Sequence, residues 1–321
     1  MIYLSDSHKP IRYLISAFQG NRLHHAFLFT GIEGVGRFNA AIQFSMVCNC
    51  ENRSDLTEPC LECPTCRRIY TNQHPDMIRI QPEGTSIKIS QIRNLRKKLS
   101  YKPVDADTRF VFVIKANLMT IESANALLKI LEEPPDCTVF ILIVENQNDV
   151  LQTISSRCQQ IRFSPCEETT IVADLLKTND INPDTARLIA GLSFGSFIRA
   201  SLYLKKKWMT KRSYILSRLE KLDQMSSGFR LCFAEQLSKK KDDIPVILDI
   251  IMSWFRDILI YRYCPERIIN KDYQQSIYDH AVKYSREAVI QKIEQIQIVQ
   301  KDVAANLNIR LALDQLILLQ L

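Results

Sequence analysis

The segment HAFLFTGIEGVG, residues 25–36, is the most informative part of the sequence for predicting the fold. Its first six residues form a short apolar run that ends at a glycine, which is typical of a buried β-strand. Gly31 and Gly36, with Gly34 between them, fit the phosphate-binding pattern G-x-x-x-x-G-K-[ST] up to its second glycine. A helix is predicted to follow over residues 39–47, so the loop joins a strand to a helix, as that pattern requires.

Apolar runs and helical patterns alternate on both sides of this loop. Further strands are predicted over residues 77–80, 110–114 and 139–144, and helices over residues 9–19, 89–99 and 121–133. Because each strand is apolar on both faces, the alternation predicts a parallel sheet covered by helices. Past Pro165 almost everything is predicted to be helical, and the last helical stretch, 288–321, is predicted to break near Asn306 and Asn308.

The residues after the glycines depart from a working phosphate loop. Lys and Ser/Thr are needed there for the phosphates and for magnesium, and this chain has Arg37 and Phe38. Arg37 keeps the charge, Phe38 has no oxygen for a metal, and Glu33 opposes a polyphosphate. The strand over 110–114 continues into Lys115 without the carboxylate that organises magnesium. We therefore predict no ATP hydrolysis by this chain and do not expect ATP as its cofactor, although nucleotide binding at the loop stays open.

Five of the ten cysteines lie between Cys48 and Cys66. In a reducing compartment such a cluster indicates a metal site more often than disulfides. Three of them form a C-x2-C-x2-C run, and the fourth ligand of a closed tetrahedral zinc site is either Cys48 or Cys50. An iron–sulfur cluster is the alternative, but the run of bacterial ferredoxins continues with a cysteine where this chain has Tyr70. We predict structural zinc, because four thiolates leave no open position for catalysis.

Composition indicates an ordinary globular protein of about two domains. Of 321 residues, 46% are hydrophobic and 24% charged, and the formal net charge is +7. The most apolar stretch, residues 246–261, contains three charged residues and therefore predicts a buried or interfacial helix instead of a membrane span. The N-terminus lacks the basic start and apolar run of a signal peptide, so a cytoplasmic protein is expected.

Two basic features suggest partners. The helix predicted over residues 89–99 places four cations between its apolar positions, namely Arg93, Arg96, Lys97 and Lys98. They form either a solvated face or a surface for nucleic acid. Arg157, in the stretch TISSRC over residues 153–158, has no acidic residue within several positions of the sequence. A lone arginine is usually a surface or salt-bridged residue. It can also stabilise the charge on a transferring phosphoryl group, provided that a partner carries the ATP.

Taken together, these segments resemble the clamp-loader branch of the AAA+ superfamily. The resemblance covers residues 1 to about 200 well and is weaker beyond. Its matching segments are HAFLF (25–29), the loop 31–36, the cysteine module, HPD (74–76), NALLKILEEPP (125–135) and SRC (156–158). The resemblance implies three parts. They are a RecA-like α/β domain over 1–165 with a zinc module at about 48–70, an all-helical lid over 166–208, and a helical collar over 209–321.

Two zinc-bearing subunit types of the bacterial family are relevant. Gamma/tau keeps complete Walker A and acidic Walker B elements, and delta' has often lost them, so Arg37, Phe38 and Lys115 favour the delta' type. The resemblance also implies the metal ligands, since counting from Gly36 favours Cys50 over Cys48. The implied zinc ligands are Cys50, Cys60, Cys63 and Cys66.

The resemblance further implies a hetero-pentamer with gamma/tau and delta that loads the sliding clamp on primed bacterial DNA. Arg157 would project in trans toward ATP held by a neighbouring gamma/tau subunit. The stretch 246–261, with Trp254 and Phe255, would be buried against sister subunits, and the alternative for this stretch is an ordinary core helix of its own domain. Two alternatives remain at this point: an active gamma/tau-like ATPase in which Arg37 replaces lysine, and a stand-alone zinc-containing DNA-binding protein.

Overall fold

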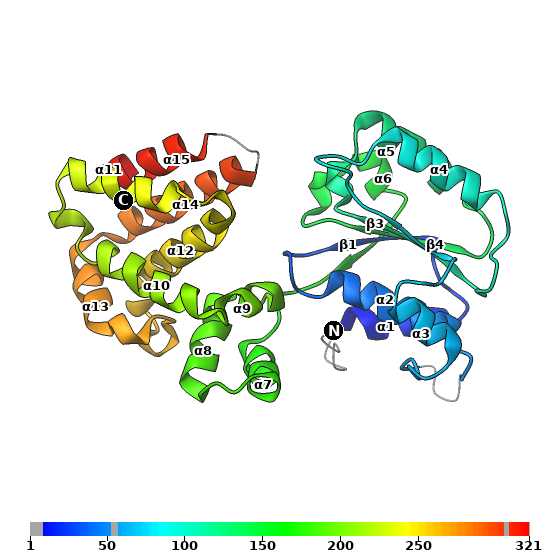
Figure 1. The fold of residues 1–321 in the computed structure, drawn as a ribbon, viewed down its shortest axis with the longest axis horizontal. Helices are drawn as coiled ribbons and strands as arrows, with labels where there is room; N and C mark the ends of the chain where they lie inside the picture. The colour runs from blue at the N-terminus through cyan, green and yellow to red at the C-terminus, as the bar shows by residue number, and fades with distance from the viewer. Residues whose placement is uncertain (1–8, 53–56, 305–307, 321) are drawn as a thin grey trace. The chain divides into compact units, whose positions relative to one another are not determined.

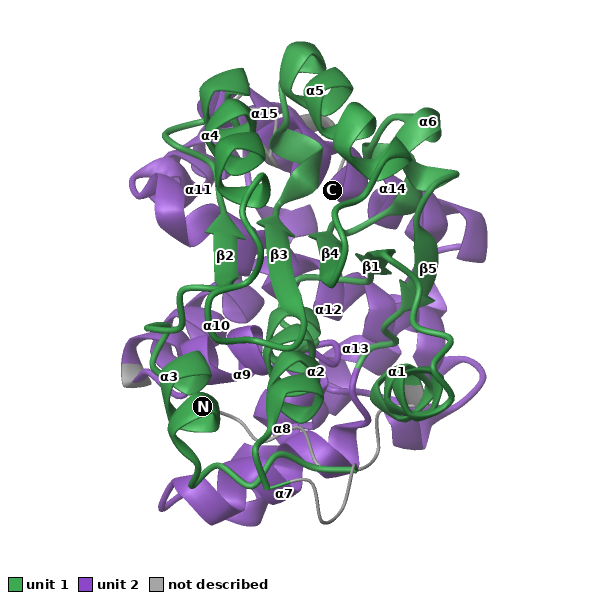
Figure 2. Ribbon diagram, turned by 90° about the vertical axis from the view of Figure 1, so that its right-hand side faces the viewer, with its two compact units in different colours: residues 1–165 green, residues 166–321 purple. Residues whose placement is uncertain are grey.

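The computed structural model describes residues 9–52, 57–304 and 308–320. The chain divides into two compact units, residues 1–165 and residues 166–321 (Figure 2). Within the described residues, no helix has both the length and the apolar character needed to cross a membrane.

A five-stranded sheet forms the centre of the first unit. In chain order the strands are β1 (Ala26–Thr30), β2 (Met77–Ile80), β3 (Arg109–Ile114), β4 (Thr138–Ile143) and β5 (Gln159–Arg162). They are arranged in the order β2-β3-β4-β1-β5, and every neighbouring pair is parallel. The parallel sheet predicted from the apolar runs is therefore confirmed. β5 was not predicted, because its sequence QQIR is polar and its burial comes only from its place beside β1.

Helices cover both faces of this sheet (Figure 1). One face carries α4 (Ile89–Leu99), α5 (Ile121–Glu132) and the short α6 (Gln152–Ser155), and the other carries α1 (Lys9–Gln19), α2 (Arg37–Asn49) and α3 (Pro64–Tyr70). Leu95 of α4 and Leu127 of α5 join Val111 and Phe140 of the central strands in one buried cluster. The amphipathic pattern of α4 thus works as predicted, because its apolar side faces the sheet and its four cations are exposed.

The second unit has no strand among its described residues. Its helices are α7 (Glu168–Thr178), α8 (Pro183–Leu192), α9 (Phe197–Tyr203), α10 (Lys206–Leu219), α11 (Ser227–Ser238), α12 (Ile244–Tyr261), α13 (Gln274–Lys283), α14 (Arg286–Ala304) and α15 (Ile309–Gln315). The predicted break in the last helical stretch is confirmed: α14 ends at Ala304, and Asn308 caps α15 by accepting a hydrogen bond from the Leu311 N–H. The boundary between lid and collar at residue 208 stays a prediction.

The central helix of this unit, α12, is buried within the chain itself. Trp254 and Phe255 are 1% and 2% exposed, and the Trp254 ring contacts the rings of Tyr273 and His280. Of the two alternatives for this stretch, burial against sister subunits is therefore wrong for Trp254 and Phe255, and burial in the core of their own unit is confirmed. The apolar pattern was identified correctly, but its partner is the chain's own helical core.

Asp249 is a buried carboxylate on α12 that connects three helices. Its side chain pairs with Arg199 of α9 at 3.3 Å and accepts a hydrogen bond from Gln300 of α14 at 3.1 Å. Burial raises the pKa of Asp249 to about 6, and Arg199 and Gln300 only partly oppose this. The folded chain therefore holds this proton more tightly than the unfolded chain, so Asp249 makes stability fall as pH rises from about 4 to 6.

We expect Asp249→Asn to remove this pH dependence. The quantity to compare is the free energy of unfolding of the variant minus that of the unaltered chain. This difference should be about 1 kcal/mol larger at pH 8 than at pH 5, because only the unaltered chain loses stability in this interval. Urea unfolding at the two pH values measures this difference. An equal effect of the substitution at both pH values would contradict the raised pKa.

Candidate functional site

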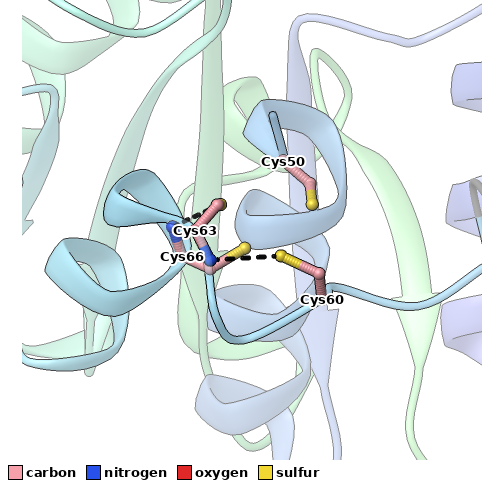
Figure 3. Close-up of side chains that lie close together, drawn as sticks. All are labelled: Cys50, Cys60, Cys63 and Cys66. Carbon is pink, nitrogen blue, oxygen red and sulfur yellow. Dashed lines mark hydrogen bonds between the residues drawn. The ribbon is translucent and has the colours of Figure 1, made fainter. Parts of the chain in front are cut away.

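Four cysteine side chains converge beside the sheet of the first unit (Figure 3). Cys50 follows the last residue of α2, Cys60 lies in the loop, and Cys63 and Cys66 lie at the start of α3. Their sulfur atoms all lie within 4.8 Å of one another. A tetrahedral zinc ion with Zn–S bonds of about 2.3 Å separates its sulfurs by roughly 3.8 Å. The four thiols therefore have the number, type and spacing that such a metal site needs.

Local hydrogen bonds hold two of these sulfurs. The backbone N–H of Cys63 donates to the Cys60 sulfur at 3.3 Å, and that of Cys66 donates to the Cys63 sulfur at 3.3 Å. Leu61 takes the left-handed conformation, φ 60°, which tightens the turn between Cys60 and Cys63. The N–H group of Cys63 is the largest influence that lowers the pKa of the Cys60 thiol, to about 6. A metal ligand must be a thiolate, and this turn favours that form.

The buried members of the cluster have the opposite tendency. Burial raises the pKa of the Cys50 and Cys66 thiols. Without a cation, four thiolates could not coexist there, since like charges in a buried site repel one another. A divalent metal ion removes this conflict, so the donor set fits a metal ion. Of the two alternatives left by spacing alone, the structure groups Cys50 with the other three, while Cys48 is buried in α2 outside the group.

The glycine loop between β1 and α2 has the backbone of a phosphate loop. Gly31, Gly34 and Gly36 have φ angles of 140°, 88° and 88°, in the region that favours glycine. A Cβ atom on Gly31 would lie 2.4 Å from the carbonyl oxygen of Phe163. Only glycine fits at that position, because the backbone beyond β5 passes so close.

The side chains around this loop satisfy each other. Arg37 is 8% exposed and its guanidinium donates to the carbonyl oxygen of Val144 at the end of β4. Burial lowers the pKa of Arg37, against the opposing effect of Glu145 and Glu33. Lys115, after β3, pairs with Glu33 of the loop at 3.4 Å. The sequence showed Glu33 and Lys115 as two separate departures from a working loop, and the structure joins them as one ion pair.

Phe38 occupies the position where a working loop has a magnesium-binding hydroxyl. Its ring contacts that of Phe112 on β3, with 5.9 Å between centroids, and the guanidinium of Arg79 on β2 lies 4.9 Å from the Phe38 centroid. An aromatic ring packed in this way offers no oxygen to a metal ion.

Arg157 lies between α6 and β5, at the amino end of β5. Its guanidinium pairs with Glu132 at 2.7 Å and donates to the carbonyl oxygen of Thr153 at 3.1 Å. Glu132 is the last residue of α5. It is 25 positions from Arg157 in the sequence, so the sequence around Arg157 does not indicate this partner. The phosphate loop follows the carboxyl end of β1, which runs parallel to β5. Arg157 and the phosphate loop therefore lie at opposite ends of these two neighbouring strands, and the strands span roughly 13–16 Å.

The HPD segment, noted in the sequence without a role, supports the fold. The Asp76 carboxylate accepts hydrogen bonds from the backbone N–H groups of residues 104–106 and lies 3.5 Å from the guanidinium of Arg109. Burial opposes ionisation, but these hydrogen bonds and Arg109 outweigh it and lower the pKa of Asp76. Asp76 therefore connects the loop before β3 to the start of β2.

Fold and loop together define a class. A parallel sheet in the order β2-β3-β4-β1-β5 with a glycine loop after its β1 strand, followed by a helical unit, is the architecture of an AAA+ α/β protein. Residues 7–167 match the family model described as DNA polymerase III, delta subunit, and residues 206–320 match the model described as DNA polymerase III, delta subunit, C terminal.

Individual relatives identify the subunit type. The chain is 30% identical over 315 residues to DNA polymerase III subunit delta' of Bacillus subtilis, covering 97% of this chain and 95% of that protein. Subunit delta' of Yersinia pestis is 29% identical over 272 residues, 82% of this chain and 78% of that protein. Subunit tau of Bacillus subtilis is 29% identical over 276 residues, but these make up only 48% of tau. The chain belongs to the delta' subunit family of DNA polymerase III, a family of clamp-loader subunits in DNA replication.

Proposed function

We propose that this chain is a clamp-loader subunit that does not hydrolyse ATP and that supplies Arg157 to ATP held by a neighbouring subunit. One observation carries the proposal: the charged side chains around the glycine loop are paired within the chain, while Arg157 is 38% exposed at the opposite ends of the strands. The chain thus combines a phosphate loop without its usual chemistry with an arginine that its own loop cannot use.

The state of the loop supports the first half of this proposal. Hydrolysis in this class needs a cation at the phosphates, a hydroxyl on magnesium and a carboxylate beyond the central strand. In their places are Arg37, which is bound to a backbone carbonyl, Phe38, and Lys115, which is paired with Glu33. The domain is complete without nucleotide, because each of these side chains already has a partner within the fold.

The place of Arg157 supports the second half. An arginine finger acts on a γ-phosphoryl group. The phosphate loop of this chain lies at the carboxyl ends of the strands, while Arg157 lies at their amino ends. Arg157 can therefore serve only a nucleotide bound by another chain. The similarity to tau of Bacillus subtilis makes a gamma/tau subunit the proposed owner of that nucleotide. The remaining proposed partners are delta, the sliding clamp indirectly, and primed DNA through the assembled complex.

The proposed cofactor is one structural zinc ion held by Cys50, Cys60, Cys63 and Cys66. Four protein thiolates close the coordination sphere, so the ion supplies no catalytic water. The ligands join the end of α2 to the start of α3, and α2 itself begins at the glycine loop. The metal would therefore hold the module against the domain and take no part in a chemical step.

Two linked measurements test the proposed function. The purified chain should show no ATP turnover above background, and millimolar ATP with magnesium should not raise its Tm, because Phe38 stands where a working loop has the hydroxyl that binds magnesium. Mixed with the gamma/tau and delta subunits of its organism, the clamp and primed DNA, it should support rapid turnover. Robust turnover by the purified chain would mean that Arg37 leaves Val144 and serves as the loop's cation.

A further inference from the structure

The end of α5 carries an unusual concentration of negative charge. Glu132 is the last residue of the helix and Glu133 follows it, before two prolines end the helical path. The C-terminus of a helix is its negative pole, so carboxylates there are unfavourable unless a cation is near. Lys129 is one such cation in the last turn of the helix. Glu132 also forms an ion pair with Arg157, while Glu133 is exposed and has no ion pair among the described residues.

The contact between Glu132 and Arg157 leaves much of the guanidinium free. One terminal nitrogen of Arg157 lies 2.7 Å from Glu132, and the other donates to the carbonyl oxygen of Thr153 at 3.1 Å. A guanidinium has five N–H donors, so three remain for another ligand. The two contacts come from different parts of the chain, the end of α5 and the turn of α6. Together they fix the direction of a side chain that is otherwise 38% exposed to solvent.

We infer that Glu132 is a positioning residue that holds Arg157 in the orientation in which it meets the neighbouring subunit's ATP. This inference rests on the proposed role of Arg157. An exposed arginine samples many rotamers, and ordering it during assembly costs conformational entropy. Glu132 orders the side chain beforehand, so the guanidinium is already oriented when the phosphoryl group begins to transfer. Glu132 itself does not touch the nucleotide.

The test uses the complete reconstituted complex with gamma/tau, delta, clamp and primed DNA. Glu132→Ala should lower the stimulated kcat for ATP hydrolysis by up to about tenfold, and by no more than Arg157→Ala does, because it acts only by misplacing that arginine. KM for ATP should stay unchanged, since another subunit binds the nucleotide. Glu132→Gln, whose amide oxygen can still accept from Arg157, should recover part of the rate. Glu133→Ala is the matched control and should behave like the unaltered complex.

A double variant separates positioning from a merely structural effect. In an Arg157→Ala background, Glu132→Ala should cause no further loss, because it acts only through that arginine. If Arg157→Ala lowers the rate but Glu132→Ala does not, or if the two losses add, the positioning role is overturned and the finger remains. If Arg157→Ala leaves the rate normal, the proposed function fails, and the positioning role fails with it. Should Glu132→Ala not assemble, Glu132→Gln decides in the same assay: a rate equal to that of the unaltered complex overturns the inference.

Discussion

Arg157→Ala is expected to lower the clamp- and DNA-stimulated ATPase rate of the assembled complex by at least about tenfold. An arginine supplied in trans contributes about 10³–10⁵ in rate at a single phosphoryl-transfer site. The measured loss should be smaller, because nucleotide sites that do not receive Arg157 remain unchanged. Folding and assembly should be nearly unaffected, since the ion pair with Glu132 is half exposed and such pairs contribute about 0–1 kcal/mol.

Two further variants give this result its meaning. Arg157→Lys keeps the positive charge but loses the planar fork that bonds Glu132 and Thr153 at once, so it should restore only a small part of the rate. Arg162→Ala is the matched control. Arg162 is an exposed arginine on β5 without an ion pair in the described part of the chain, and its loss should leave the rate unchanged. A normal stimulated rate for Arg157→Ala would end the finger assignment.

Cys63→Ser is expected to release one zinc ion per chain and to lower the free energy of unfolding of the first unit by about 3 kcal/mol or more. Binding of a structural zinc ion contributes directly to folding, so loss of one ligand removes a large share of that energy. Cys63 also caps α3 by accepting the N–H of Cys66, and serine is itself a good N-cap. The substitution therefore removes the metal ligand while it keeps the cap, and the loss of stability reports on the metal.

Metal content by mass spectrometry and chemical unfolding measure the effect of Cys63→Ser. Cys137→Ser is the control, because Cys137 is an exposed cysteine outside the cluster. Cys48→Ser and Cys50→Ser decide the fourth ligand: Cys48→Ser should keep the zinc, and Cys50→Ser should lose it. Unchanged metal content in Cys63→Ser would show that the four thiols do not hold the ion.

The first unit was largely predictable because its signals are local. A strand buried on both faces is apolar at nearly every position, so β1, β3 and β4 appear in the sequence as apolar runs, with polar residues only at their ends. β5 was not predicted, because a short polar strand has no apolar run in its sequence. α3 was missed too, since its seven residues follow the cysteine turn and depend on the capping of Cys63.

The amino-acid sequence alone is enough to recognise the residue types that a motif has kept or lost. It showed a loop without lysine and hydroxyl, a strand end without a carboxylate, and a cysteine run with metal spacing. These features depend on neighbours in the chain, and spacing along the chain is all that the patterns require. The parallel sheet and the helical second half followed from periodicity in the same way.

Which of these residues contact one another depends on the three-dimensional fold. Glu33 and Lys115 are 82 positions apart, Glu132 and Arg157 are 25 apart, and both pairs lie within 3.4 Å. Cys50 joins the cysteine cluster instead of Cys48, and Trp254 is buried in its own unit instead of at a subunit surface. Contacts of this kind depend on how strands and helices pack across the chain. No local pattern in the sequence records that packing.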